Sequence, residues 1–141
     1  QIAVWRSDED DGVRPLHMSS LGQWENGATG GCNVLNYPDR EAERETQVIG
    51  LDRLISKEPW IDWMKLDCEG SECPILLTSE LFPSCVANIV LEYHDFLPRT
   101  SLPGIKESYT VETLAEYLRS VGYRVRIEPK GEKIGFLFAG Q

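Results

Sequence analysis

Three charged residues alternate along one short stretch of the sequence, "WIDWMKLDCEGSECPIL" (60–76). Lys65, Asp67 and Glu69 are spaced two residues apart, and Gly70 follows directly. Because side chains in a β-strand point alternately to its two faces, this spacing puts the three charges on one face. A carboxylate can take a proton from a hydroxyl group, so Asp67 and Glu69 are candidates for acid–base chemistry.

A second polar group closes the apolar stretch "ANIVLEYH" (87–94), where Glu92 and His94 stand near the end. Unperturbed histidine titrates near neutral pH, which suits proton transfer, although a lone histidine more often has a structural role. If both stretches are parallel neighbouring strands, their ends lie at one rim of the sheet, where open α/β sheets bind ligands. We therefore predict Asp67, Glu69 and His94 as catalytic residues. Glu69, Glu92 and His94 are also the predicted substrate contacts.

Structural interpretations of the same residues stay open. Lys65 would be the deepest of the three charges, and we expect it to pair with Asp67 or Glu92, because an unpaired buried charge is costly. Asp67, Glu69 or Ser71 could instead accept from the free N–H groups of the helix that follows. Asp67 and Glu69 could also hold a divalent cation, although two carboxylates are too few to establish a metal site.

The elements that would position these residues alternate between strand and helix. Residues 2–8, 60–67 and 87–94 have the composition of strands, and residues 50–58, 72–82 and 110–123 that of helices. The last helix has the clearest signals, with Thr110 as N-cap and Gly122 as its stop. The alternation predicts a mostly parallel sheet with helices on both faces.

The ends of this arrangement differ from its middle. "YRVRIEP" and "KIGFLFAG" flank "PKGE" and predict a C-terminal antiparallel hairpin. Residues 9–47 lack clear periodicity, and we expect an irregular insertion there. A length of 141 residues corresponds to one α/β domain over 1–141.

The composition limits the partners and the compartment. A net charge of −9 argues against nucleic acid or an anionic membrane surface, since both need a basic patch. No apolar run approaches the ~18 residues of a membrane span. The four cysteines are irregularly spaced, so we expect free thiols in a reducing compartment, the cytoplasm; disulfides and a structural zinc site stay open.

Taken together, "IGLDRLI", "IDWMKLDCEGSECPIL" and "ANIVLEYH" resemble the FkbM-type methyltransferases. That family shows a "T-L-D-x-L" helix, then "K-x-D-x-E-G-x-E" at the end of a strand, then a strand ending near "E-x-H". "IAVWRSD" (2–8) resembles the family's "A-V" strand end, which precedes a variable insertion. The matching positions in the three longer stretches are Leu51, Asp52, Leu54, Lys65, Asp67, Glu69, Gly70, Glu72, Glu92 and His94.

The resemblance implies an S-adenosylmethionine-dependent methyltransferase that acts on a hydroxyl of a small molecule or glycan. It implies a Rossmann-like methyltransferase sheet that ends in an antiparallel hairpin, and cofactor contacts from Ala3 and Asp67. It also implies that the strands with the main cofactor contacts precede residue 1, so the fold would be incomplete at its N-terminus. Residues 1–141 alone would then be inactive, and an open sheet edge could let chains associate.

Two other kinds of protein fit the same sequence. One is a non-catalytic α/β interaction module, and the other is a metal-dependent hydrolase that uses Asp67 and Glu69. A glycine-rich strand–turn upstream of Gln1 would favour the transferase, and strong binding of a divalent ion would favour the hydrolase. The acceptor has no readable code in the sequence.

Overall fold

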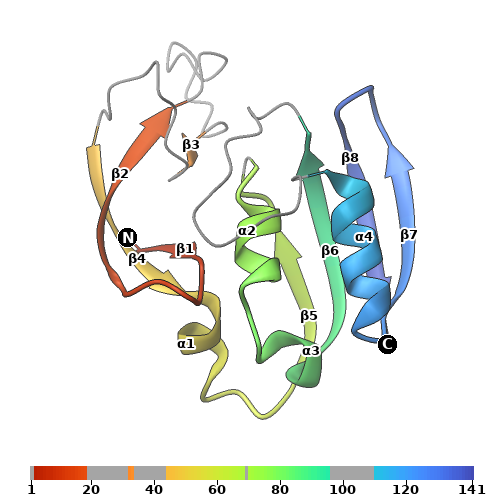
Figure 1. Ribbon diagram of the computed structural model, residues 1–141, viewed down its shortest axis with the longest axis horizontal. Helices are drawn as coiled ribbons and strands as arrows, with labels where there is room; N and C mark the ends of the chain where they lie inside the picture. The colour runs from red at the N-terminus through yellow and green to blue at the C-terminus, as the bar shows by residue number, and fades with distance from the viewer. Residues whose placement is uncertain (1, 19–31, 34–43, 69, 96–109) are drawn as a thin grey trace.

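Two four-stranded sheets and four short helices make up the part of the chain that the computed structural model describes, residues 2–18, 32–33, 44–68, 70–95 and 110–141 (Figure 1). The strands are β1 Ile2–Trp5, β2 Gly12–Met18, β3 Cys32–Asn33, β4 Arg44–Gly50, β5 Ile61–Leu66, β6 Val86–His94, β7 Arg124–Pro129 and β8 Ile134–Gly140. The helices are α1 Leu51–Ile55, α2 Glu72–Leu77, α3 Phe82–Cys85 and α4 Val111–Ser120.

The C-terminal sheet has the strand order β5-β6-β8-β7. β5 and β6 are parallel neighbours, with Leu66 opposite Leu91, as the sequence predicted. β8 runs antiparallel to both β6 and β7, which confirms the C-terminal hairpin. Two short helices, α2 and α3, connect β5 to β6 where one helix was expected. The carboxyl ends of β5 and β6 therefore lie at the same rim of this sheet.

The N-terminal sheet corrects the predicted architecture. Its order is β1-β4-β2-β3, with β1 parallel to β4 and β2 antiparallel to both β4 and β3. A single, mostly parallel sheet was expected, and residues 9–47 were expected to be irregular, yet they include β2, β3 and the start of β4. Pro15 lies within β2 and has no N–H to donate to a neighbouring strand. Because proline is rare inside sheets, the sequence did not indicate a strand here.

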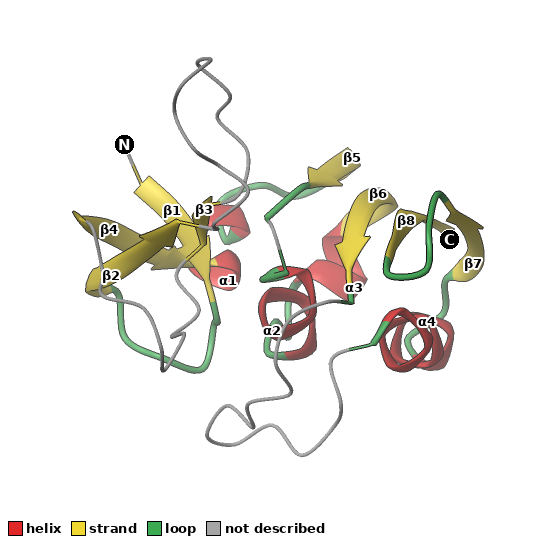
Figure 2. Cartoon of the chain, turned by 90° about the horizontal axis from the view of Figure 1, so that it is seen from above, coloured by secondary structure: helices red, strands yellow, loops and turns green. Residues whose placement is uncertain are grey.

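The helices α2 and α4 lie on the same side of the C-terminal sheet (Figure 2). Strand residues on that side, such as Ile89, Leu91 and Leu137, are fully buried. On the opposite side Phe138 is half-buried beneath the guanidinium of Arg126, 4.5 Å from its ring centroid. Helices on both faces were expected, but the described helices cover this sheet on one face only.

Local sequence signals account for α4. The hydroxyl of Thr110 accepts a hydrogen bond from the N–H of Thr113 (3.3 Å), which confirms Thr110 as the N-cap. Gly122 follows the helix with a φ of +101°, a backbone conformation that favours glycine. The face of α4 that packs on the sheet consists of Val111, Leu114, Ala115 and Leu118.

Asp52 closes the turn between α2 and α3. Its carboxylate accepts hydrogen bonds from the N–H groups of Glu80 (2.9 Å) and Leu81 (3.2 Å) and from the hydroxyl of Ser79. α1, which carries Asp52, is five residues long and thus shorter than the predicted 50–58. The acidic residue of the first motif therefore stabilises the fold.

Candidate active site at the ends of β5 and β6

A sharp turn follows β5 and leads into α2. Gly70 has a φ of +101°, where a residue with a Cβ would be strained. The N–H of Ser71 donates to the carbonyl of Cys68 (3.1 Å) and closes the turn. The chain can therefore reverse within a few residues of the end of the strand, directly after Asp67.

Glu72, the first residue of α2, is the buried acidic group of this turn. Its Oε1 accepts from the N–H of Cys68 (2.6 Å) and its Oε2 from the N–H of Gly70 (2.9 Å). Hydrogen bonds to a charged acceptor are shorter and stronger than those between neutral groups. One carboxylate thus fixes the main chain on either side of the sequence position of Glu69.

His94, the last residue of β6, contacts the same carboxylate. Its Nδ1 lies 3.5 Å from Oε1 of Glu72, and the two side chains are 6% and 3% exposed. The neighbouring Asp95 accepts from the N–H of Val111 (3.0 Å) and so joins the end of β6 to the start of α4. Burial raises the pKa of Asp95, and the charges of Glu112 and Glu72 add to this effect.

Asp67 is the solvent-accessible carboxylate of the candidate site. It pairs with Lys65 at 3.2 Å, and the side chains of Lys65 and Asp67 are 68% and 38% exposed. The predicted partner is confirmed, but the expected depth of Lys65 is wrong. β5 is an edge strand, and no described helix covers the face on which Lys65 lies, so alternation directs this side chain to solvent.

The remaining predicted site residues are distributed over both sheets. Glu92 is half-buried in β6, opposite Phe136 of β8. Ala3 lies in β1, paired with Val48, and so belongs to the other sheet from Asp67 and His94. Glu69 lies outside the described residues. The structure therefore brings Asp67 and His94 to one rim and does not place Ala3 in the same sheet.

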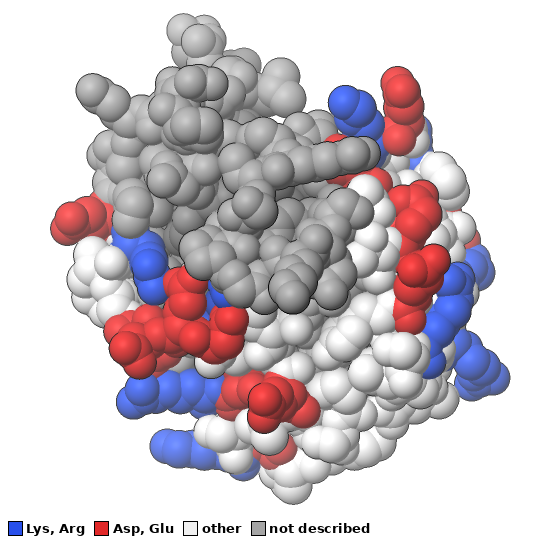
Figure 3. Space-filling view, viewed as in Figure 1, with Lys and Arg blue, Asp and Glu red and all other residues white. Residues whose placement is uncertain are grey.

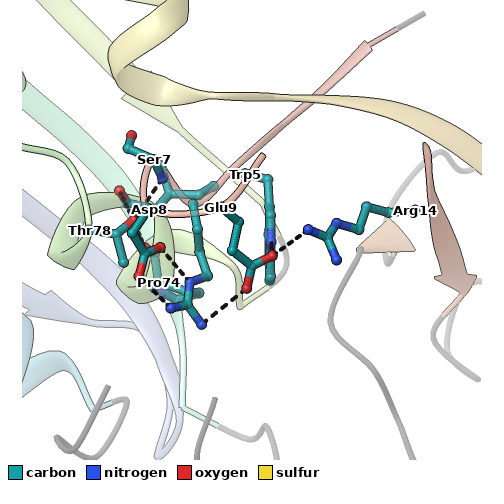
Figure 4. Close-up of polar contacts among 9 residues, drawn as sticks. Trp5, Ser7, Asp8, Glu9, Arg14, Pro74 and Thr78 are labelled. Atoms are coloured by element: carbon teal, nitrogen blue, oxygen red, sulfur yellow. Dashed lines mark hydrogen bonds and ion pairs between the residues drawn. The ribbon is translucent and has the colours of Figure 1, made fainter. Parts of the chain in front are cut away.

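A second charged cluster surrounds the end of β1. Arg6 is almost fully buried and donates two hydrogen bonds to Asp8, from Nε (2.8 Å) and Nη2 (2.6 Å). Its guanidinium holds the pKa of Asp8 below the usual range. Figure 4 shows Glu9 between Trp5 and Arg14, with Oε2 3.1 Å from the indole nitrogen and 2.6 Å from the guanidinium.

This cluster anchors the N-terminal sheet to α2. The N–H of Ser7 donates to the hydroxyl of Thr78, the C-cap residue of α2, at 3.0 Å. The N–H of Asp52 in turn donates to the hydroxyl of Ser7 (3.0 Å). The acidic residues that follow β1 have the composition of a turn, so sequence alone did not reveal this network.

A hollow of about 360 Å³ lies on the uncovered face of the C-terminal sheet. It is lined by Trp63, Asn88, Ile89, Arg124, Arg126, Phe138, Ala139 and Gly140. Asn88 is near the start of β6 and pairs with Gly140 near the end of β8, whereas His94 closes β6 at its other end. The hollow is therefore separate from the candidate site.

Charges on the described surface are mixed. Figure 3 shows acidic and basic side chains next to each other at several places along the edge of the molecule, and a broad uncharged area in the middle. Within the described ranges no helix is long and apolar enough to cross a membrane, and no group of three or more metal-ligating side chains gathers. Cys73 and Cys85 are free thiols, and burial strongly raises the pKa of Cys73.

Sequence reasoning missed the roles of Glu72 and Asp95. Glu72 carried a signal, because it matches the last position of the motif "K-x-D-x-E-G-x-E", but no role was assigned to it. Asp95 directly follows His94, but its bond to Val111 spans sixteen residues and gives no local pattern.

Comparison with known proteins identifies the family. No curated protein and no solved structure matches the chain. The family profile described as "Methyltransferase FkbM domain" matches residues 10–125, which include the turn after β5, the end of β6 and α4. Because the match covers most of the chain and contains the ends of both β5 and β6, this protein belongs to the FkbM methyltransferase family.

Proposed function

We propose that the protein is an S-adenosylmethionine-dependent methyltransferase that methylates a hydroxyl oxygen of a small molecule or sugar. Family membership supports methyl transfer in general. The observation that carries the finer assignment is the pairing of β5 with β6, which puts the exposed Asp67 and the acid-bound His94 at one rim. The parallel pair followed by an antiparallel hairpin also supports a Rossmann-like methyltransferase sheet.

The side chains at this rim fit such a cofactor in charge. A sulfonium cation, an amino group and ribose hydroxyls all favour carboxylate partners, and Asp67 has a carboxylate that solvent reaches. Ser71 adds a buried hydroxyl that has no hydrogen-bond partner within the described residues. We propose Ala3 as a further contact, from β1. When bound, the cofactor supplies a methyl group that an oxygen nucleophile can attack, with the thioether sulfur as the leaving group.

In this reaction the acceptor oxygen forms a bond to the methyl carbon, the carbon–sulfur bond breaks with its electrons left on sulfur, and the acceptor loses its proton. Asp67, Glu69 or His94 would take that proton, which typically accelerates such steps by about 10²–10⁴-fold. Glu69, Glu92 and His94 would contact the acceptor. Alignment of the acceptor oxygen is the larger contribution and can supply about 7–11 kcal/mol in favourable cases.

We also propose the compartment of the protein and the classes of partner that it binds. The free thiols of Cys73 and Cys85 support the cytoplasm, and the net charge of −9 disfavours nucleic acid and anionic membranes as partners. β5 is an edge strand, and Trp63 on it is 65% exposed, which supports self-association through this edge. Sedimentation of wild type and Trp63→Lys tests this, since the variant should be the smaller species if the edge is an interface.

Methyl transfer to a panel of sugars and hydroxylated small molecules tests the function. Residues 1–141 and the whole polypeptide encoded by the gene are each incubated with methyl-labelled S-adenosylmethionine. We expect Asp67→Asn to lower transfer by at least about tenfold. Asp62→Asn, an exposed carboxylate on the same strand, should leave transfer unchanged. Absence of transfer and of cofactor binding in both polypeptides would refute the proposal, and tight binding of a divalent ion would point to the hydrolase.

A further inference from the structure

Glu72 is a buried acidic side chain to which none of the proposed chemical roles applies. We infer that it is the positioning residue of the active site: one carboxylate holds both the main chain after Asp67 and the imidazole of His94. The inference rests on the proposed function, because the groups that Glu72 holds are those proposed to take the proton of the acceptor.

The geometry requires an acceptor with two oxygens. Oε2 of Glu72 accepts from the N–H of Gly70, while Oε1 accepts from the N–H of Cys68 and faces Nδ1 of His94. A carboxylate has about four acceptor positions, whereas a glutamine amide has one oxygen and an NH₂ group that donates. Glutamine in this place would set a donor against one of these N–H groups.

The burial of Glu72 calls for such a role. Residues Glu72 to Leu76 of α2 are all buried, and the four after Glu72 are Cys73, Pro74, Ile75 and Leu76. An ionised side chain is costly to bury, and an apolar residue of similar size often stabilises a fold as well or better. Within the described residues, the hydrogen bonds and the ion pair of Glu72 go to the turn after β5 and to the end of β6, so its charge acts on the site.

The contact also favours one of the two neutral tautomers of His94. A carboxylate beside Nδ1 favours the proton on Nδ1, and the lone pair of the neutral ring then lies on Nε2. Nε2 would be the atom that accepts the acceptor proton. Asp95 also lies near His94, and its carboxylate accepts from the N–H of Val111. Glu72 is the acid whose carboxylate faces Nδ1 of the ring.

Nitrogen NMR of the imidazole tests this without any need for activity. The ¹⁵N shifts of the neutral ring distinguish a proton on Nδ1 from one on Nε2, and a His17→Gln variant assigns the two histidines. We expect His94 to carry its proton on Nδ1 in wild type and to move toward the Nε2–H form in Glu72→Gln. A wild-type ring with its proton on Nε2 would overturn the inference without recourse to any variant.

Amide hydrogen exchange and kinetics complete the test. In Glu72→Gln we expect exchange at Cys68 or Gly70 to accelerate by about tenfold. The kcat for methyl transfer should fall while KM for the acceptor changes by less than about twofold. Glu116→Gln on the exposed face of α4 is the matched control and should change none of these. Unchanged tautomer and exchange in Glu72→Gln would refute positioning. An altered tautomer in a protein without methyl transfer would refute the proposed function alone.

Discussion

Two equally buried serines provide a direct test of how hydrogen bonds stabilise this fold. Ser71 and Ser79 are each 3% exposed. Ser79 donates to the carboxylate of Asp52 and accepts from the N–H of Phe82 (3.4 Å). Ser71 has no side-chain partner within the described residues, and its hydroxyl makes no cap bond to α2. The same substitution by alanine should therefore destabilise the protein at Ser79 and not at Ser71.

The magnitudes follow from what each hydroxyl does. Ser79→Ala breaks a hydrogen bond to a charged group, which contributes about 1.5–3 kcal/mol to stability. Ser71→Ala breaks no bond and removes a buried polar group whose desolvation costs about 1–3 kcal/mol, so stability should stay unchanged or rise. The two variants should differ by at least about 1.5 kcal/mol. For a chain of this size that corresponds to about 5 °C in Tm.

Thermal and urea denaturation followed by circular dichroism measure this difference. Ser79→Ala should melt clearly below wild type, and Ser71→Ala at or above it. Equal losses in both variants would mean that the hydroxyl of Ser71 is bonded in solution, and the reasoning would fail. If the bound cofactor forms a hydrogen bond with the hydroxyl of Ser71, S-adenosylmethionine should stabilise wild type more than Ser71→Ala.

Three further outcomes follow from single groups. Because burial raises the pKa of Asp95, the native state binds more protons than the unfolded state above the ordinary aspartate pKa. Stability should therefore fall as pH rises through that window, and urea unfolding of Asp95→Asn should lack this slope. Tyr123, whose pKa burial raises to about 12, donates to a carbonyl of β6 at 2.5 Å. Tyr123→Phe should cost about 1 kcal/mol in thermal melts. Cys73 should react with alkylating agents more slowly than Cys68 or Cys85 in a mass-spectrometric time course, because it is buried and its thiol pKa is raised.

The C-terminal sheet could be predicted because its signals are local. α4 has an N-cap, an apolar stripe and a glycine stop within thirteen residues, Thr110 to Gly122. A strand–helix–strand order favours parallel neighbours, and β5 and β6 are paired in that way. The spacing of apolar residues over a few positions predicted which segments are helices and which are strands. The order of these elements along the chain predicted which strands are neighbours.

The N-terminal sheet and the exposure of Lys65 depend on distant parts of the chain. β2 pairs with β4 about thirty residues away, and Pro15 conceals the strand. Whether a strand face is buried depends on which helices cover it, and alternation within β5 shows only that Lys65 and Trp63 share a face. The exposure of Lys65 could therefore not be predicted from the sequence, whereas its pairing with Asp67 could.

The burial of the motif carboxylates explains why they have different roles. Asp52 and Glu72 each accept two backbone N–H groups at a turn, so their acceptor positions are engaged in the fold. Within the described part of the chain, Asp67 pairs with an exposed lysine, an interaction that contributes at most about 1 kcal/mol. A substrate or cofactor can displace a weak, solvent-accessible pair at low cost, but not a buried acceptor of two amides. Among the described residues, the acidic motif thus combines carboxylates that hold the turns, Asp52 and Glu72, with the accessible Asp67, and substitution at Asp67 should change activity more than stability.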